Sequence, residues 1–336
     1  MKKLIIPVVV LAIVMGATSV VKRVGRHHGG DSVAGEGRPI SYDELYVEVS
    51  ALGNLDYFYD HKLGMKLAGK LFGVRTEYVG PADYDIRAMI TAFEQTLAKK
   101  GLKGVVVVGF EDALIPIINK AVRLGIPVVT VDADLAASKR VAFVGTGNFQ
   151  AGYEGGRKLA SLIGYKGKVA LMTKVGQSNL DERVRGYESA LGKYKDVEIV
   201  QTVDTQSDSI VAAQVAAAVL QNNPDLAGLG CVEAAGGVGA ATAVREAKLA
   251  GKVKIVSMDR GNDVLGLIKD GLISATIAQQ TALMPLYAVE ILHMLNNHKI
   301  PITTDNAAAG ISGVPSFVDT GVVVVDESNY RYFLRQ

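Results

Sequence analysis

Carboxylate side chains stand directly after several apolar runs of this sequence. In the segment IPVVTVDADL, Asp132 and Asp134 follow a run of valines, Glu233 follows LAGLGCV, and Asp259 follows VKIVSM. A carboxylate accepts hydrogen bonds through two oxygens, so it can hold a pair of neighbouring hydroxyl groups. A single acid at the end of a strand is more often a helix N-cap, and the pattern indicates a binding site only because it recurs.

Groups that complement these acids stand where other runs end. Tyr57 and Phe58 follow the first run, Asn179 and Arg183 lie in GQSNLDERVRGY, and Gln279 ends SATIAQ. Amide and guanidinium groups donate in a plane, and aromatic rings cover the apolar C–H faces of a sugar. Taken alone, the two aromatic residues would more often belong to a core. Together the set predicts a site for one small polyhydroxylated ligand, formed by Tyr57, Phe58, Asp132, Asp134, Asn179, Arg183, Glu233, Asp259 and Gln279.

Other kinds of chemistry have weaker support in the sequence. Gly237-x-Gly239 with Asp259 about 20 residues further on resembles a dinucleotide fingerprint, but Thr242 replaces the third glycine, and small residues at helix–strand contacts explain the pattern equally well. Paired acids could also hydrolyse a glycosidic bond, although nothing marks one of them as the acid. Serine-hydrolase, zinc-protease and P-loop motifs are absent, and the single Cys231 cannot form an intramolecular disulfide. We therefore expect no catalysis, cofactor or metal, and keep a secreted nicotinamide-dependent or glycoside-acting enzyme as the less favoured alternative.

Short apolar runs alternate with amphipathic segments along the chain, which predicts parallel sheets covered by helices on both faces. One helical pattern is LGMKLAGKLFG, in which Leu63, Leu67 and Leu71 recur every fourth residue and Gly73 ends the helix. The runs are too many for one sheet, so the expected fold class is α/β with two doubly wound lobes. The expected strands cover residues 45–52, 75–80, 104–110, 127–133, 140–145, 168–174, 197–203, 226–232, 253–258, 274–279 and 321–326.

An internal repeat supports two lobes. Residues 121–134, AVRLGIPVVTVDAD, resemble residues 247–261, AKLAGKVKIVSMDRG: each has a helix end, a turn, a strand and an aspartate at the strand's carboxyl end. Ligands of open α/β sheets lie beyond the carboxyl ends of the strands. Asp132 and Asp259 are therefore expected to be equivalent residues of two lobes that face one cleft.

The first residues have the layout of an export signal. Lys2 and Lys3 precede an apolar run and a group of small residues, so residues 1–21 are expected to be a signal peptide or an uncleaved N-terminal anchor. A Gly-rich, charged linker is expected over residues 22–41. Because 36 basic and 34 acidic residues leave a formal net charge of +2, no nucleic-acid partner is expected.

Several of these segments resemble the periplasmic sugar-binding proteins of the ribose-binding type, the type I receptors of bacterial sugar ABC importers. The segments are LGNLDYFYDHKLG, GIPVVTVDADLAASKRVAFVGTGNFQAGYEGGRKL, ERVRGY, KIVSMDRG and DGLISATIAQ, in the family's order, and the similarity spans residues 42–325. The resemblance implies two lobes joined by a three-segment hinge, with crossings near residues 146–148, at Gln279 and Gln280, and near residues 310–313. The lobes would comprise residues 42–146 with 280–311, and 147–279 with 312–336.

The resemblance also implies which residues touch the ligand: Tyr57, Phe58, Asp132, Arg183, Asp259 and Gln279. Departures from the family pattern bear on the ligand. Ala133 stands where ribose binders carry arginine, Val232-Glu233 replaces Asn-Asp, and Gly147 replaces an acid. In related proteins that bind a furanosyl quorum-sensing signal, a lysine stands at the position of Ala51. A pentose, a hexose or inositol all stay open as the ligand.

The implied function is that of an exported receptor in the periplasm or outside the cell. It would be a monomer that closes its lobes on the ligand and delivers it to an ABC permease in the membrane. A ligand-sensing module of the same fold, feeding a receptor kinase or a chemoreceptor, is the alternative, and an uncleaved anchor would favour it.

Overall fold

The computed structural model describes residues 41–55, 57–298 and 300–334, which belong to the compact unit of residues 38–336. The expected signal peptide or anchor at residues 1–21 lies outside the described residues, as does the expected linker at residues 22–41 except for its last residue. Among the described helices, none has both the length and the apolar character of a membrane-spanning segment.

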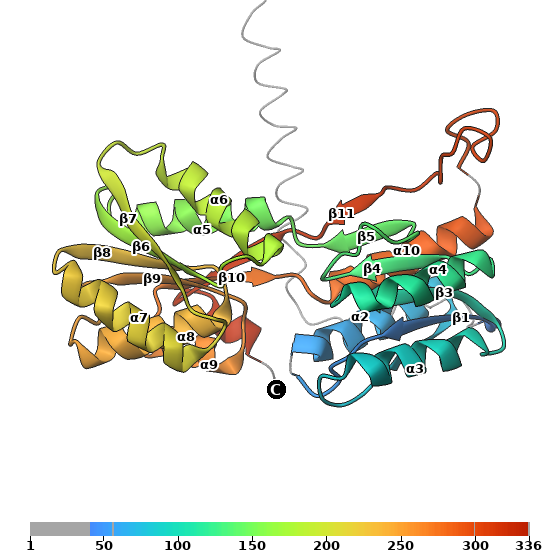
Figure 1. Cartoon of the computed structure of the whole chain (residues 1–336), viewed down its shortest axis with the longest axis horizontal. Coiled ribbons are helices and arrows are strands. Elements are labelled where there is room, and N and C mark those ends of the chain that lie inside the picture. Colours follow the sequence, from blue (N-terminus) through green and yellow to red (C-terminus); the bar gives the residue numbers. More distant parts are fainter. Residues whose placement is uncertain (1–40, 56, 299, 335–336) are drawn as a thin grey trace, which may run out of the picture. The chain divides into compact units, whose positions relative to one another are not determined.

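Two six-stranded sheets organise the described chain (Figure 1). The first is entirely parallel, in the spatial order β11 (Phe317–Asp319), β5 (Ala142–Gly145), β4 (Val128–Val131), β3 (Leu102–Val108), β1 (Ser41–Val49) and β2 (Val74–Val79). The second has the order β12 (Val322–Asp326), β10 (Ala275–Gln279), β9 (Lys254–Met258), β8 (Leu226–Cys231), β6 (Gly167–Thr173) and β7 (Val197–Asp204). Only β12 runs antiparallel to its neighbour. The predicted α/β class with two doubly wound lobes is confirmed.

Helices cover both faces of each sheet (Figure 1). On the first sheet, α2 (Tyr57–Phe72) and α10 (Leu283–Asn297) lie on one face, and α3 (Ile86–Leu97) and α4 (Ile115–Arg123) with the short η1 (Asp112–Leu114) lie on the other. On the second sheet, α5 (Asn148–Leu162) and α6 (Ser178–Leu191) lie opposite α7 (Ser209–Asn222), α8 (Ala234–Glu246), α9 (Asn262–Lys269) and η2 (Tyr330–Phe333).

Successive side chains of a strand point into the cores on opposite faces of the sheet. In β3, Val106 and Val108 join the core under α2 and α10, whereas Val105 and Val107 join the core under α3 and α4. All four side chains are fully buried. This is why the buried strands read as unbroken valine runs in the sequence.

The chain crosses between the sheets after β5, after β10, and between β11 and β12. The third crossing lies at Thr320 and Gly321, so the expected crossing near residues 310–313 was wrong, and residues 317–319 belong to the first lobe. The physical reason is that the three-residue strand β11 pairs with β5, where the ring of Phe317 stacks on Phe143 at 5.4 Å. A strand this short carries no periodic signal.

The buried face of α2 differs from the face that the leucine pattern indicated. The helix ends as expected before Gly73, whose φ is +67°. Leu63, Leu67 and Leu71, however, are 48%, 38% and 62% exposed. The buried face carries Phe58, Asp60, His61, Gly64, Met65, Ala68 and Gly69. Small residues on this face let α2 approach the crossing segment that follows β10 closely.

Replacing Gly64 by alanine should therefore destabilise the fold. A Cβ at this position would collide with the carbonyl oxygen of Ala282 and lie 2.7 Å from Cγ of Pro285. We expect Gly64→Ala to lower the free energy of unfolding by about 1–3 kcal/mol, as overpacking does. Gly266→Ala in α9 is the control, because its Cβ meets nothing within 4 Å, and it should stabilise by about 0.5–1 kcal/mol. Equal effects of the two changes in urea denaturation would contradict this account of α2.

Candidate functional site

Asp132 and Asp259 occupy equivalent positions in the two lobes. Asp132 follows β4 with φ +65°, and Asp259 follows β9 with φ +66°. The backbone N–H of Asp132 donates to the carbonyl of Val144 at 3.1 Å, and that of Asp259 donates to Ile277 at 2.9 Å. Each aspartate therefore bonds to the next strand of its sheet while its chain turns away. A left-handed backbone is uncommon for residues other than glycine, and aspartate tolerates it better than most.

Tyr57 links the first lobe's aspartate to helix α2. It is the first residue of α2, and its hydroxyl donates to Oδ1 of Asp132 at 2.5 Å. Burial, followed by the charges of Asp132 and Asp259, raises the pKa of Tyr57 well above 10. The phenol therefore stays protonated and acts as a donor at every physiological pH.

Gln279 holds the second lobe's aspartate. Its amide donates to Oδ1 of Asp259 at 2.8 Å from the end of β10. Burial raises the pKa of Asp259 above 3.8, and the charges of Asp132 and Glu233 act in the same direction. Arg183 and the amide of Gln279 oppose this shift.

Arg183 brings a buried positive charge close to Tyr57 and Asp259. Its Nε donates to Oδ1 of Asn148 at 2.9 Å, and its Nη1 donates to the carbonyl of Val232 at 3.0 Å. These contacts use only part of the five N–H groups of a guanidinium. Its charge opposes the upward shift in the pKa of both Tyr57 and Asp259, so the residues of the two lobes share one electrostatic environment.

A cavity of about 540 Å³ lies between residues of the two lobes. Tyr57, Asp259 and Gln279, which the sequence predicted, are among the lining residues. The complete lining is Asn54, Leu55, Tyr57, Asp60, Ala234, Asp259, Arg260, Gly261, Asn262, Asp263, Gln279 and Thr281.

An ion pair across this cavity was missed at the sequence level. Nη2 of Arg260, in the loop after β9, donates to Oδ2 of Asp60 at 2.5 Å. The hydroxyl of Thr281 donates to the same oxygen at 2.7 Å, and Nη1 of Arg260 donates to the carbonyl of Phe333. Asp60 stands one helical turn after Tyr57, and this spacing was the only signal that could have placed both on one side of α2.

The other predicted site residues do not line the cavity: Phe58, Asp132, Asp134, Asn179, Arg183 and Glu233. Phe58 is buried in the core, where its ring lies 5.9 Å from Phe110. Asn179 is partly exposed in the first turn of α6.

Asp134 and Glu233 have partners of their own. Asp134 accepts from Nε and Nη2 of Arg140 at 2.5 and 2.6 Å, and from the hydroxyl of Thr130. Glu233 accepts from the hydroxyls of Thr205 and Ser207. Their carboxylates therefore fix loops within a single lobe.

The two glycines of the dinucleotide-like pattern lie inside α8. A Cβ on Gly237 would collide with Ser257, and one on Gly239 would collide with Ala212. The pattern therefore reflects close packing of α8. The part of the chain that the structure describes holds no cluster of three or more His, Cys, Asp or Glu side chains that could bind a metal ion.

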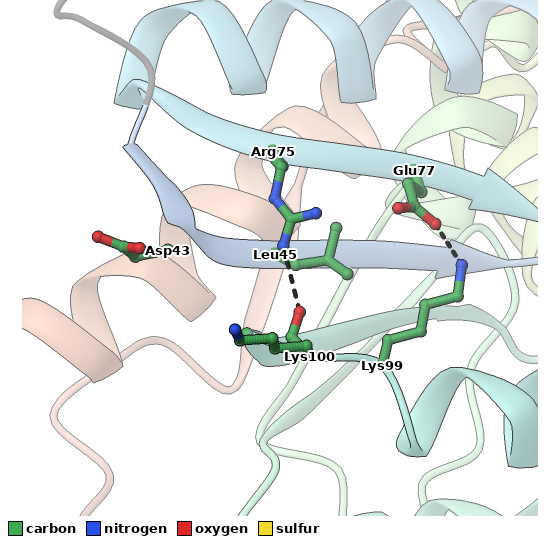
Figure 2. Close-up of a pocket in the computed structure, with 7 residues that line it drawn as sticks. Asp43, Leu45, Arg75, Glu77, Lys99 and Lys100 are labelled. Carbon is green, nitrogen blue, oxygen red and sulfur yellow. Dashed lines mark hydrogen bonds and ion pairs between the residues drawn. The ribbon is translucent and has the colours of Figure 1, made fainter.

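A second cavity, of about 610 Å³, lies at the amino ends of β1, β2 and β3 (Figure 2). Its charged groups contact one another: Lys99 pairs with Glu77, and Arg75 donates to the carbonyl of Lys100 at 3.1 Å. None of the predicted site residues lines it. We therefore place the candidate site at the carboxyl ends of the strands, where the aspartates are.

Two doubly wound lobes with a polar cavity between their carboxyl-end loops define a substrate-binding protein. The family model described as "Periplasmic binding protein domain" matches residues 47–299, and the chain belongs to this family. Like the relatives it matches, it is a binding protein and not an enzyme.

Three relatives illustrate the similarity. The D-allose-binding periplasmic protein of Escherichia coli (strain K12) is 28% identical over 250 residues, which cover 71% of this chain and 80% of that protein. The structure of AraP, an arabinose-binding protein from Geobacillus stearothermophilus, is 36% identical with a TM-score of 0.82, and the match covers 87% of this chain and all of that chain. The structure of a sugar-binding protein of a sugar ABC transporter from Bacillus halodurans is 33% identical with a TM-score of 0.81, over 87% of this chain and 100% of the other.

The raised pKa of Asp259 predicts that Asp259→Asn stabilises the ligand-free protein at neutral pH. The folded pKa lies above the unfolded value of 3.8, so ionisation costs stability, and this cost develops as the pH rises through the folded pKa. Asparagine removes the charge and tolerates the same backbone conformation. The melting temperature of Asp259→Asn should therefore exceed that of the wild type at pH 7, and the difference should shrink in acid.

Asp326→Asn is the control of opposite sign. Hydrogen bonds from Ser328 and Lys158 lower the pKa of Asp326 to about 2. Its contribution to stability is present above pH 3.8 and is lost as the pH falls through about 2. This variant should melt below the wild type at pH 7, and a change of the same sign in both variants would refute the electrostatic account.

Proposed function

We propose that this protein captures a small sugar or cyclitol between its lobes and delivers it to an ABC importer. The observation that supports the proposal is the pair of equivalent aspartates, one from each lobe. Asp132 accepts from Tyr57 and Asp259 accepts from Gln279, and Tyr57, Asp259 and Gln279 line the cavity between the lobes. A sugar offers hydroxyl groups that both donate and accept, and buried donors and acceptors of this kind reject analogues that lack a hydroxyl.

Each group has a role in the proposed complex. Asp132 and Asp259 accept hydrogen bonds from the sugar hydroxyls, and Arg183 donates to a ring or hydroxyl oxygen. Gln279 donates to and orients Asp259, and the ring of Tyr57 covers an apolar face of the sugar. The carboxylates are opposed by Arg183 and Arg260, which suits a neutral ligand better than a charged one.

Closure of the lobes follows from the same contacts. A ligand shifts an equilibrium between two conformations only by binding one of them better, and a sugar held by Asp132 and Asp259 together can do this only when the lobes meet. The ion pair of Asp60 with Arg260 connects the two lobes beside the cavity and adds to the stability of the closed form. The three crossings at Gly145–Asn148, at Gln279 and Gln280, and at Thr320 and Gly321 would act as the hinge.

The proposed ligand is an aldose or a cyclitol. Relatives are named for allose and arabinose, and Ala133 replaces the arginine that the resemblance implies for ribose binders. We further propose that the protein is exported, acts in the periplasm or outside the cell as a monomer, and docks on a membrane permease.

A thermal-shift panel tests the proposal directly. The panel would contain arabinose, ribose, allose, glucose and myo-inositol, with the acyclic polyol glycerol as a control. A sugar at 100 times its dissociation constant should add about 2.7 kcal/mol to the free energy of unfolding. Asp259→Asn should lose this gain, because the amide cannot replace a carboxylate that accepts through both oxygens. If no member of the panel raises the melting temperature, the protein does not have the proposed function.

The contact between the lobes predicts a second effect on affinity. Asp60→Asn keeps the shape of the side chain but leaves Arg260 without its charged partner, so the dissociation constant for the sugar that binds should rise by about tenfold, or about 1.4 kcal/mol. Asp134→Asn is the matched control, because it breaks an equally close pair with Arg140 inside the first lobe. It should leave the affinity within about twofold while lowering stability. Isothermal titration calorimetry of both variants tests this prediction. Equal losses of sugar affinity would show that the pair of Asp60 with Arg260 does not stabilise the closed form.

A further inference from the structure

A fully buried acid–base pair lies behind the candidate site. Nδ1 of His61 is 2.6 Å from Oε1 of Glu48, and both side chains are 0% exposed. His61 is one turn along α2 from Tyr57 and Phe58, and Glu48 is the residue before the last of β1. None of the proposed sugar contacts uses either group.

The surroundings of His61 connect it to the site. The ring centroid of His61 lies 5.9 Å from that of Tyr57 and 5.0 Å from that of Phe58. The charged side chains that act on it are Glu48 of β1, Asp132 after β4 and Asp60 of α2.

Arg260, in the loop after β9, adds a positive charge beside these groups, and it pairs with Asp60 of α2. In β2, the phenol of Tyr78 responds to the charges of Glu48 and Asp132. Ala282, just before α10, and Pro285, in its first turn, lie against α2 and are uncharged. His61 therefore lies among three carboxylates, of which Asp60 also pairs with Arg260.

The charge state of His61 follows from these neighbours. Burial lowers the pKa of His61, but the carboxylates of Glu48, Asp132 and Asp60 outweigh burial, and the pKa is raised above 6.5. The imidazole is thus protonated over a wider pH range than a free histidine.

The pair is a poor device for stability. Oε2 of Glu48 and Nε2 of His61 are buried and have no hydrogen-bond partner among the described residues. Burying two charges costs several kcal/mol per ion before their attraction is counted, and apolar residues of similar volume are often as stable. The benefit of the pair must therefore lie in what it does to its neighbours.

We propose that the buried Glu48–His61 pair is the positioning element of the sugar site, fixing the first turn of α2 under Tyr57 and placing a positive charge behind Asp132. This inference rests on the proposed function. Closing on a neutral sugar removes water from Asp132 and Asp259, which costs free energy because the two carboxylates repel one another and lose solvation. A fixed imidazolium behind Asp132 offsets part of that cost. Protonated His61 therefore favours the sugar-bound form.

The test compares two His–Glu pairs of the same lobe. Glu48→Gln and His61→Gln disrupt the proposed element. Glu44→Gln and His293→Gln are the matched controls, because Glu44 stands four residues earlier on β1 and is 3.3 Å from Nδ1 of His293, at the far end of the strand. Affinity for arabinose, allose and ribose would be measured by calorimetry between about pH 5.5 and pH 9, a range that spans histidine titration.

The wild-type affinity should fall as the pH rises through the pKa of His61. His61→Gln should bind about tenfold more weakly at pH 6, since removing a buried charged partner is costly, and its affinity should no longer depend on this titration. Glu48→Gln should weaken binding and move the midpoint of the affinity profile to lower pH. The control variants should keep both the affinity and the pH profile of the wild type.

NMR titration of the imidazole resonances separates this inference from the proposed function. If the wild type binds no sugar, the proposed function fails, whereas a raised pKa of His61 that falls in Glu48→Gln would still show the coupling of the pair. If a sugar binds but Glu48→Gln and His61→Gln keep the wild-type affinity and pH profile, the positioning role is overturned. Should His61→Gln fail to fold, Glu48→Gln, which keeps the volume of the side chain, decides alone.

Discussion

The placement of Asp132 and Asp259 is the constraint on which the rest of the site depends. Both stand at the carboxyl end of a central parallel strand, with a left-handed backbone and an N–H bonded to the neighbouring strand. Both acids are half-buried: Tyr57 donates to Asp132, Gln279 donates to Asp259, and the charge of Arg183 acts on Asp259. Desolvation raises the pKa of Asp259, so the ionised form of this side chain costs stability.

Helix α2 connects this site to the body of the first lobe. One side of its first turns carries Tyr57, Asp60 and His61, which contact Asp132, Arg260 and Glu48 respectively. Gly64 on the buried face lets the helix approach the segment that crosses between the lobes. These side-chain contacts and this close backbone approach therefore all involve the helix whose first residue, Tyr57, lines the cavity.

Acids of the same local pattern have different roles. Asp132 and Asp259 belong to the shared environment of the two lobes, whereas Asp134 is bound on both oxygens by Arg140 and Glu233 accepts from Thr205 and Ser207. The difference lies in the partners that each side chain finds within its own lobe. A carboxylate whose acceptor sites are filled locally fixes a loop, and only one with remaining capacity can accept from a ligand.

The sequence alone determined the alternation of strands and helices, the two lobes, and the equivalence of Asp132 and Asp259, because burial periodicity and a repeated segment are local properties of the chain. It also predicted Tyr57 and Gln279, partly through resemblance, and both line the cavity. Only the tertiary structure decided that Phe317–Asp319 pairs with β5, that the leucines of α2 face outward, and that Asp60 meets Arg260. The paired residues lie 174 and 200 residues apart (Phe317 with Phe143, Arg260 with Asp60), and the exposure of the leucines depends on which face of α2 meets a neighbour. No local pattern encodes such pairings, since they arise when separately formed elements exclude water together.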